Sequence, residues 1–293
     1  MFAVLETHPV AFLLAIAILG LTIGSFLNVV IHRLPIMMKR AWADECHEWL
    51  KENSQTNDAE GEGSGKPYNL IVPRSQCSAC GHQITARENV PVISYLVLRG
   101  RCAACRASIS LQYPLIEILT AILSLIVAWH YGYAWHTVGA LLFTWALIAL
   151  AVIDFHTQLL PDSITLPMLW LGLLGNVGGL FVDLQSSVLG AACGYLSLWC
   201  VYHLFKFLAG KEGMGYGDFK LLAMLGAWGG WQILPLVILL SSVAGAAVGI
   251  GLIVIKGRDR NVPIPFGPYL AIAGWIAFLW GPKITQIYLQ HVL

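Results

Sequence analysis

Long apolar runs, separated by shorter polar segments, dominate the pattern of residues along this chain. The first run extends from Val10 to Ile31 without a charged side chain. Because a helix needs about 20 apolar residues to cross a hydrocarbon core about 30 Å thick, this run predicts a membrane-spanning helix. Residues 1–9 contain no lysine or arginine and no A-x-A-like site closes the run, so we do not expect a cleaved signal peptide. Further apolar runs lie at about 114–131, 137–153, 163–182, 187–208, 219–231, 233–255 and 265–281.

The pattern therefore predicts an all-α polytopic membrane protein with about eight transmembrane helices. The stretch 219–255 is divided into two spans because Gly229 and Gly230 form a natural break, and the first of these spans is short. Composition agrees, since 57% of the residues are hydrophobic, 11% are charged and the mean hydropathy is +0.71. Soluble domains usually carry about 25% charged residues, so the lipid bilayer is the expected partner of this surface. The net charge of +1 does not indicate nucleic-acid binding.

Lysine and arginine are distributed unevenly along the chain, which predicts its orientation. Ten of the 17 lie between Arg33 and Arg106, and most of the others fall in later loops or at span ends. Cytoplasmic loops of membrane proteins carry an excess of these residues. Eight spans with both termini in the periplasm put 16 of the 17 on one side, whereas seven spans split the basic loops between both sides.

The polar residues divide the chain into three predicted parts. Residues 1–33 hold the first transmembrane helix, 34–113 form a small cytoplasmic domain, and 114–293 form a seven-helix membrane domain. Within the polar part, residues 51–66 contain no large apolar side chain, which predicts a flexible loop.

Four of the seven cysteines form two C-x-x-C pairs in the polar domain, Cys77 with Cys80 and Cys102 with Cys105. Each pair can present two thiolates to one metal, and Zn²⁺ prefers a tetrahedral set of four sulfurs. Such a set leaves no open position, so the pairs predict a structural zinc site in a zinc-ribbon-like domain. The alternative is a redox dithiol or disulfide, which the reducing cytoplasm disfavours. Cys193 and Cys200 lie in an apolar run and are interpreted as packing residues.

Acidic residues are scarce in the membrane domain, and two of them lie at span ends. Asp154 ends the third apolar run, and Asp218 follows the glycine-rich segment 213–217 and opens the sixth. The predicted topology brings both to the same membrane boundary. Two carboxyls in one poorly solvated cleft share a proton, and such a pair can hydrolyse a peptide bond. The other interpretation of Asp218 is a helix N-cap, and position alone leaves both open. Glu117, about one turn inside the second span, is either functional or reaches the interface.

The order of several short motifs closely resembles the type IV prepilin peptidase family over essentially the whole chain. The motifs are Gly-Ser-Phe-Leu-Asn-Val-Val at 24–30, the two C-x-x-C pairs, Asp154 with Leu-Leu-Pro-Asp at 159–162, Gly-Tyr-Gly-Asp at 215–218 and Pro-Phe-Gly-Pro at 265–268. The resemblance implies a GxGD-type aspartyl protease of the bacterial inner membrane, with its active site facing the cytoplasm. Asp154 and Asp218 match the catalytic pair of the family, whereas Asp162 does not. The four cysteines match the zinc site of its bifunctional members.

The resemblance also implies substrates and a second activity. The family removes the basic leader of type IV prepilins and of the pseudopilins of type II secretion, and many members then methylate the new N-terminus with S-adenosylmethionine. No motif in the chain identifies the methyl-transfer residues. Three other functions are compatible with parts of the sequence: a membrane thiol oxidoreductase, a transporter with intramembrane carboxylates, and a peptidase that lacks methylation. The first needs cysteines on the periplasmic side, the second needs carboxylates near the bilayer midplane, and the third often lacks the cysteine domain.

Overall fold

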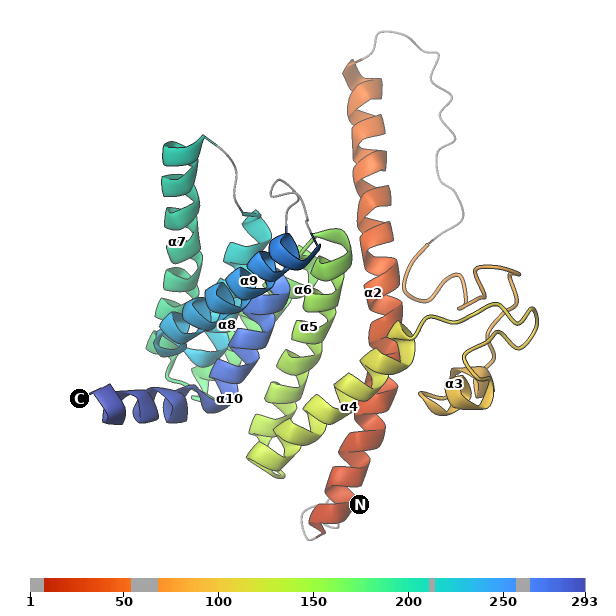
Figure 1. Ribbon diagram of the computed structural model, residues 1–293, viewed down its shortest axis with the longest axis horizontal. Coiled ribbons are helices and arrows are strands. Elements are labelled where there is room, and N and C mark those ends of the chain that lie inside the picture. Colours follow the sequence, from red (N-terminus) through yellow and green to blue (C-terminus); the bar gives the residue numbers. More distant parts are fainter. Residues whose placement is uncertain (1–7, 54–67, 211–213, 257–263, 293) are drawn as a thin grey trace. The chain divides into compact units, whose positions relative to one another are not determined.

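The computed structural model describes residues 8–53, 68–210, 214–256 and 264–292, and their regular structure is helical, with no strand in these ranges. The predicted all-α class is therefore confirmed (Figure 1). Two isolated β-bridges lie in the cysteine-rich part. The α-helices are α2 (Pro9–Asn53), α3 (Ile93–Val97), α4 (Gln112–Tyr131), α5 (Trp135–Thr157), α6 (Asp162–Val177), α7 (Leu184–Ala209), α8 (Tyr216–Gly229), α9 (Leu234–Lys256) and α10 (Gly267–Val292); the 3₁₀ turns are η1 (Arg87–Asn89) and η2 (Trp231–Ile233).

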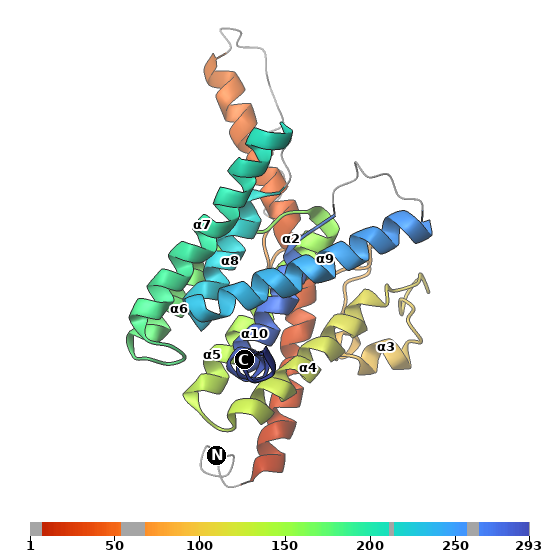
Figure 2. The ribbon, with the colours of Figure 1, turned by 60° about the vertical axis from the view of Figure 1, so that its left-hand side comes forward.

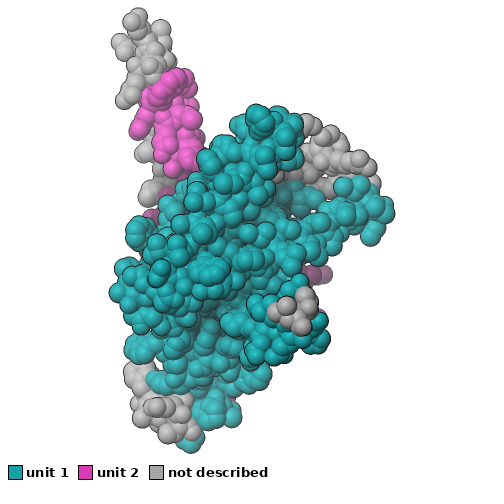
Figure 3. All heavy atoms as spheres, turned by 90° about the vertical axis from the view of Figure 1, so that its left-hand side faces the viewer, with its two compact units in different colours: residues 1–13, 124–293 teal, residues 14–123 magenta. Residues whose placement is uncertain are grey.

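The chain forms two compact units, coloured separately in Figure 3. Unit 1 comprises Met1–Leu13 and Ser124–Leu293, and unit 2 comprises Leu14–Leu123. Unit 2 therefore holds the cysteine pairs, and unit 1 holds the two span-end aspartates. The domain boundaries predicted at residues 33 and 113 stay a prediction.

Helix α2 is much longer than the apolar run that predicted it. It has 45 residues and continues through Pro35 to Asn53, as the long helix near the N-terminus in Figure 1 shows. A proline costs an α-helix one hydrogen bond and adds a local clash, which can kink rather than end it. Residues 51–53 of the predicted loop are thus helical, and residues 54–66 lie outside the described residues.

Five helices in the described part of the chain are long and apolar enough to cross a membrane, which supports the prediction of a membrane protein. The predicted count of eight spans stays a prediction, because α6 and α8 have only 16 and 14 residues. At 1.5 Å per residue, α8 rises about 21 Å, which is less than a hydrocarbon core of about 30 Å. The five helices that are both long and apolar enough are Pro9–Lys51, Gln112–Tyr131, Trp135–Thr157, Leu184–Ala209 and Trp231–Ile255; α10, although it has 26 residues, is not among them.

Helix α8 is surrounded by other helices of unit 1 over most of its length. Every residue from Leu221 to Gly229 is buried, and α8 packs against α6, α7 and α10 (Figure 2). Small residues let α7 approach closely: a Cβ on Gly194 would lie 2.6 Å from the Leu222 carbonyl oxygen. Close backbone approach through glycines is the usual way in which membrane helices pack. The predicted break after α8 is confirmed, since Gly230 has φ +77° and separates α8 from η2 and α9.

A buried amide joins the far end of α8 to α6. Asn176 is 1% exposed, donates to the Ala227 carbonyl at 2.9 Å and accepts the Phe181 backbone N–H at 3.0 Å. The Trp228 indole N–H donates to the Met168 carbonyl of α6 at 2.7 Å. Because buried polar groups without partners are costly, these bonds fix the relative position of α6 and α8.

Candidate functional site

Asp154 lies in the last turn of α5, where the helix ends in a left-handed residue. The C-cap Gln158 has φ +56° and donates its N–H to the Asp154 carbonyl at 2.9 Å. The side chain of Asp154 is 5% exposed and faces the interior of unit 1. An acidic group at such a position needs a hydrogen-bond donor or a proton, because water is largely excluded.

The start of α10 supplies that donor. The backbone N–H of Gly267 donates to Oδ2 of Asp154 at 2.9 Å, across 113 positions of sequence. Gly267 is the first residue of α10, so the helix dipole also favours negative charge there. A Cβ at this position would lie 2.6 Å from the same oxygen, which explains why glycine occupies it.

Asp218 lies in the first turn of α8 and is 7% exposed. Its backbone N–H donates to the Gly215 carbonyl at 3.2 Å. The glycine before it permits a close approach of the loop that follows α5: a Cβ on Gly217 would lie 2.8 Å from the Leu160 Cβ. The Gly-Tyr-Gly-Asp segment therefore places the carboxyl against the end of α5. The Gly215 N-cap has no side chain that can cap α8, and Asp218 lies within the first turn rather than at the N-cap.

The two aspartates share one buried region of unit 1. The Asp154 carboxylate acts electrostatically on Asp218, and α10 packs against both α5 and α8. Two carboxyls in a region that excludes water repel one another when both are ionised, so a state with one shared proton is favoured. Such a pair has one group that can accept a proton and one that can donate a proton. The catalytic role of the pair stays a prediction.

Asp162, the third acidic residue of this region, has a different environment. Its carboxylate accepts from the Lys220 ammonium at 2.6 and 2.9 Å, and its side chain is 52% exposed. The pair links the first turns of α6 and α8 at the surface. An exposed ion pair of this kind contributes about 0–1 kcal/mol, which indicates a modest structural role.

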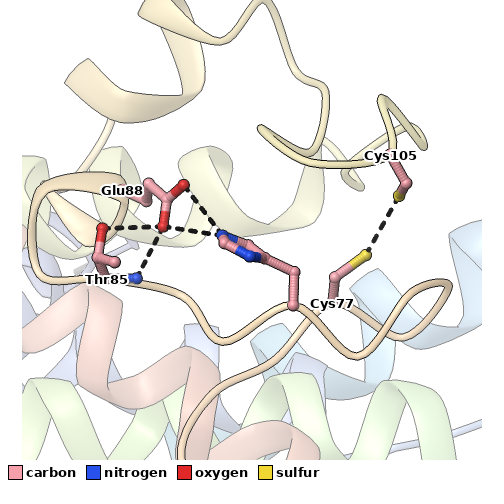
Figure 4. A network of polar contacts seen from close by, with 5 residues as sticks. Cys77, Thr85, Glu88 and Cys105 are labelled. Atoms are coloured by element: carbon pink, nitrogen blue, oxygen red, sulfur yellow. Dashed lines mark hydrogen bonds and ion pairs between the residues drawn. The ribbon is translucent and has the colours of Figure 1, made fainter.

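The four predicted zinc ligands come together in unit 2. The sulfurs of Cys77, Cys80, Cys102 and Cys105 all lie within 4.8 Å of one another, and those of Cys77 and Cys105 are 3.8 Å apart (Figure 4). A tetrahedral zinc site with Zn–S bonds of about 2.3 Å has sulfur–sulfur edges of about 3.8 Å. The four sulfurs therefore match the donor set of a zinc site, and the Cys77–Cys105 distance matches its sulfur–sulfur edge.

Backbone amides lower the pKa of two of the four cysteines, whereas the pKa of Cys80 is raised to about 11, because the His82 amide lowers it but the thiol of Cys105 and burial raise it more. Each pair lies in a tight turn closed by a β-bridge, Gln76 with Gln83 and Arg101 with Ser108. Backbone N–H groups of Ala79 and then Cys80 point at the first sulfur and lower the pKa of Cys77 to about 6. Backbone amides of the second turn likewise lower the pKa of Cys102. Metal ligands must be deprotonated, so the backbone amides favour binding at Cys77 and Cys102, and a bound metal would have to displace the proton of Cys80.

A carboxylate beside the cluster fixes the first turn. Glu88 accepts from the backbone N–H and the hydroxyl of Thr85, both at 2.8 Å, and contacts Nε2 of His82 at 3.2 Å (Figure 4). These contacts, with the Thr85 amide first, lower the pKa of Glu88. The network stabilises the turn that holds Cys77 and Cys80. It adds no ligand, because His82 contacts Glu88 and is not part of the four-cysteine cluster.

Two features of these sites were not predicted from the sequence. The sequence assigns no role to Gly267, although Pro268, directly after it, is typical of the first turn of a helix. The sequence allows two interpretations of Glu117, a functional group or one that reaches the interface, and in the structure Glu117 is 8% exposed and accepts the Val92 backbone N–H at 2.7 Å. It therefore does not reach an aqueous interface, and it joins α4 to the segment before α3.

Comparison with known proteins identifies the family. Residues 18–131 match the bacterial peptidase A24 N-terminal domain, and residues 141–250 match the type IV leader peptidase family. A protein of Stutzerimonas stutzeri named prepilin leader peptidase/N-methyltransferase is 57% identical over 98% of this chain and 96% of its own length. Proteins of the same name from Pseudomonas aeruginosa and Aeromonas hydrophila are 56% and 58% identical, over 98% and 94% of this chain and 96% and 92% of their own lengths. No solved structure matches the chain. The chain therefore belongs to the type IV leader peptidase family.

Proposed function

We propose that this protein is an aspartic endopeptidase of the bacterial inner membrane that removes the leader peptide of type IV prepilins and pseudopilins on the cytoplasmic face. The observation that carries the proposal is the pair of buried carboxyls, Asp154 and Asp218, which α5 and α8 bring together in a chain of this family. The relatives named prepilin leader peptidase/N-methyltransferase, alike over nearly the whole chain, support the substrate class.

In the proposed mechanism the two aspartates share one proton. The ionised carboxylate takes a proton from water, and the oxygen of that water attacks the carbonyl carbon of the scissile bond. The protonated carboxyl gives its proton to the carbonyl oxygen, and the tetrahedral intermediate then collapses with rupture of the C–N bond and protonation of the leaving amine. The Gly267 N–H holds one oxygen of Asp154, so the carboxyl keeps a fixed direction between these steps.

We propose that the four cysteines bind one structural zinc ion. Four sulfurs fill a tetrahedral site, so no position is left for a substrate or water. The ion would tie the two turns of unit 2 together, where the described residues 68–111 contain only short elements, η1 and α3. Zinc would therefore contribute to stability rather than to hydrolysis.

We further propose that the protein methylates the new N-terminal amine, with S-adenosylmethionine as donor. This half of the function rests on the name of the relatives. The purified protein, incubated with a prepilin and S-adenosylmethionine, should yield a product without its leader and heavier by one methyl group. Mass spectrometry of the product tests both halves: an intact substrate contradicts the peptidase, and a cleaved but unmodified product leaves a peptidase only.

Gly267→Ala is expected to lower the cleavage rate about 10- to 100-fold, because small misplacements of reacting groups have effects of this size. The new methyl group would displace the Asp154 carboxylate from its hydrogen bond, since its position is 2.6 Å from Oδ2. Gly245→Ala is the matched control, because a Cβ there meets nothing closer than 3.6 Å. Initial rates at equal membrane abundance check the prediction, and equal rates for the two variants would contradict it.

The orientation of the chain can be tested with reporter fusions. Fusions after residues 60 and 212 should both report a cytoplasmic location, and fusions near 134 and 184 a periplasmic one. The reason is the one-sided distribution of lysine and arginine. A periplasmic signal at 212 would place Asp218 on the opposite side of the membrane from the predicted position of Asp154, and the shared-proton mechanism would then fail.

A further inference from the structure

Helix α3 exposes an apolar face outside the predicted membrane spans. Ile93, Leu96 and Val97 are 60%, 68% and 75% exposed. Their spacing of three and four residues puts them on one side of the helix. Three large apolar side chains side by side on a short helix are unusual on a surface that faces water.

A hydrogen bond fixes the position of the start of α3 along the axis of α4. The backbone N–H of Val92, immediately before α3, donates to Oε2 of Glu117 at 2.7 Å. Glu117 is five positions beyond Gln112, the first residue of α4, so it lies about 7.5 Å along that helix at 1.5 Å per residue. The start of α3 is therefore level with the second turn of a helix that can cross the membrane.

The hydrogen bond between Val92 and Glu117 forms although the backbone of Val92 is strained. This indicates that the position of α3 along α4 is fixed by the structure. Val92 has φ +60°, a conformation that a β-branched residue rarely adopts. Such a conformation persists only where surrounding contacts determine it. Here the buried Glu117 carboxylate accepts the N–H of that same residue, and Tyr95 packs against Gly100, which holds the end of α3 in a tight turn.

The part of α4 next to the start of α3 exposes apolar side chains, and the segment that follows α3 exposes basic ones. Leu115 and Ile118, on the turns of α4 that include Glu117, are 63% and 43% exposed. Arg99 and Arg101 follow α3 directly, and both are exposed. Apolar side chains flanked by arginine are typical of helices that lie in a membrane interface with anionic headgroups.

We propose that α3 is an interfacial helix that inserts Ile93, Leu96 and Val97 into the leaflet crossed by the first turns of α4. Arg99 and Arg101 would contact the phosphate groups of anionic lipids. The second cysteine pair begins five residues after α3, at Cys102, so this contact would hold the cysteine cluster against the bilayer surface. The proposal concerns lipid and does not depend on the peptidase activity.

Photocrosslinking on the full-length protein tests the proposal. A photoreactive benzophenone amino acid is placed at position 96, in vesicles of phosphatidylethanolamine and phosphatidylglycerol, and lipid adducts are quantified by mass spectrometry. Position 115, exposed on α4, is the positive control, and position 79, exposed between two cysteines, is the negative control. Because position 79 lies between two predicted zinc ligands, a monodisperse elution profile in detergent, rather than zinc content, verifies that each variant is folded.

The expected result is a lipid adduct at position 96 that is several-fold stronger than at position 79, and stronger in vesicles with more phosphatidylglycerol. Position 97 should behave in the same way. A signal at 96 no higher than at 79, while 115 labels normally, would overturn the proposal. An adduct at 96 to added prepilin in place of lipid would also overturn it, because the face would then bind the substrate helix.

Discussion

Asp154→Asn and Asp218→Asn are each expected to lower the rate of prepilin cleavage about 10³-fold or more. Asparagine keeps the size of the side chain but cannot exchange a proton in the reaction. Its oxygen can still accept the N–H of Gly267, which Asp154 accepts at 2.9 Å, so the variants should fold and insert normally. Because the two groups act as one unit, the double variant should be little worse than either single variant. Initial rates at equal membrane abundance measure all three.

Asp162→Asn is the matched control, because Asp162 is acidic, near the same helix ends and paired with Lys220 at the surface. Loss of an exposed ion pair has a small effect, so this variant should keep substantial activity. Methylation of a substrate supplied already cleaved should survive both catalytic changes if the second activity uses a separate site. Near-normal cleavage by Asp154→Asn or Asp218→Asn would end the hypothesis of a catalytic pair.

Removing zinc is expected to unfold the cysteine-rich part of unit 2. Structural zinc contributes roughly 10–16 kcal/mol of apparent binding free energy in small zinc domains, which exceeds the stability of most domains. The double variant Cys77→Ser/Cys105→Ser breaks the 3.8 Å sulfur pair and should lose most of the metal. Elemental analysis should give about one zinc per chain before the change. Hydrogen exchange of residues 68–111 should show a loss of protection after it.

Cys193→Ser/Cys200→Ser is the control for this change, since both cysteines are exposed on α7 and lie outside the cluster. Zinc content and exchange in residues 68–111 should be unchanged in that variant. Freshly purified, reduced protein without zinc would falsify the assignment, and so would an equal loss of zinc from both double variants.

The apolar pattern was sufficient to predict the helical class, because membrane helices satisfy their backbone hydrogen bonds within one segment. The break at Gly229 and Gly230 was predictable for a similar reason: it depends on residues at the break itself. The cysteine cluster was also predictable, since each C-x-x-C turn is local and four thiols are the donor set of a single metal ion. The predicted loop is wrong for residues 51–53, which are helical, because a lack of apolar residues does not by itself end a helix.

Other features depend on contacts between distant segments, and only the tertiary structure decided them. Gly267 meets Asp154 across 113 positions, and Glu117 meets Val92 across 25, so no local period could reveal either bond. The sequence predicts a short apolar helix at 219–231, but it does not show that α6, α7 and α10 surround this helix, because a helix is apolar on all sides whether its neighbours are lipid or other helices. The sequence by itself determined which segments are apolar enough for lipid, which form helices and which cysteines can bind a metal. Packing decided which carboxylates are buried together, because burial depends on the neighbours that the fold brings to each side chain.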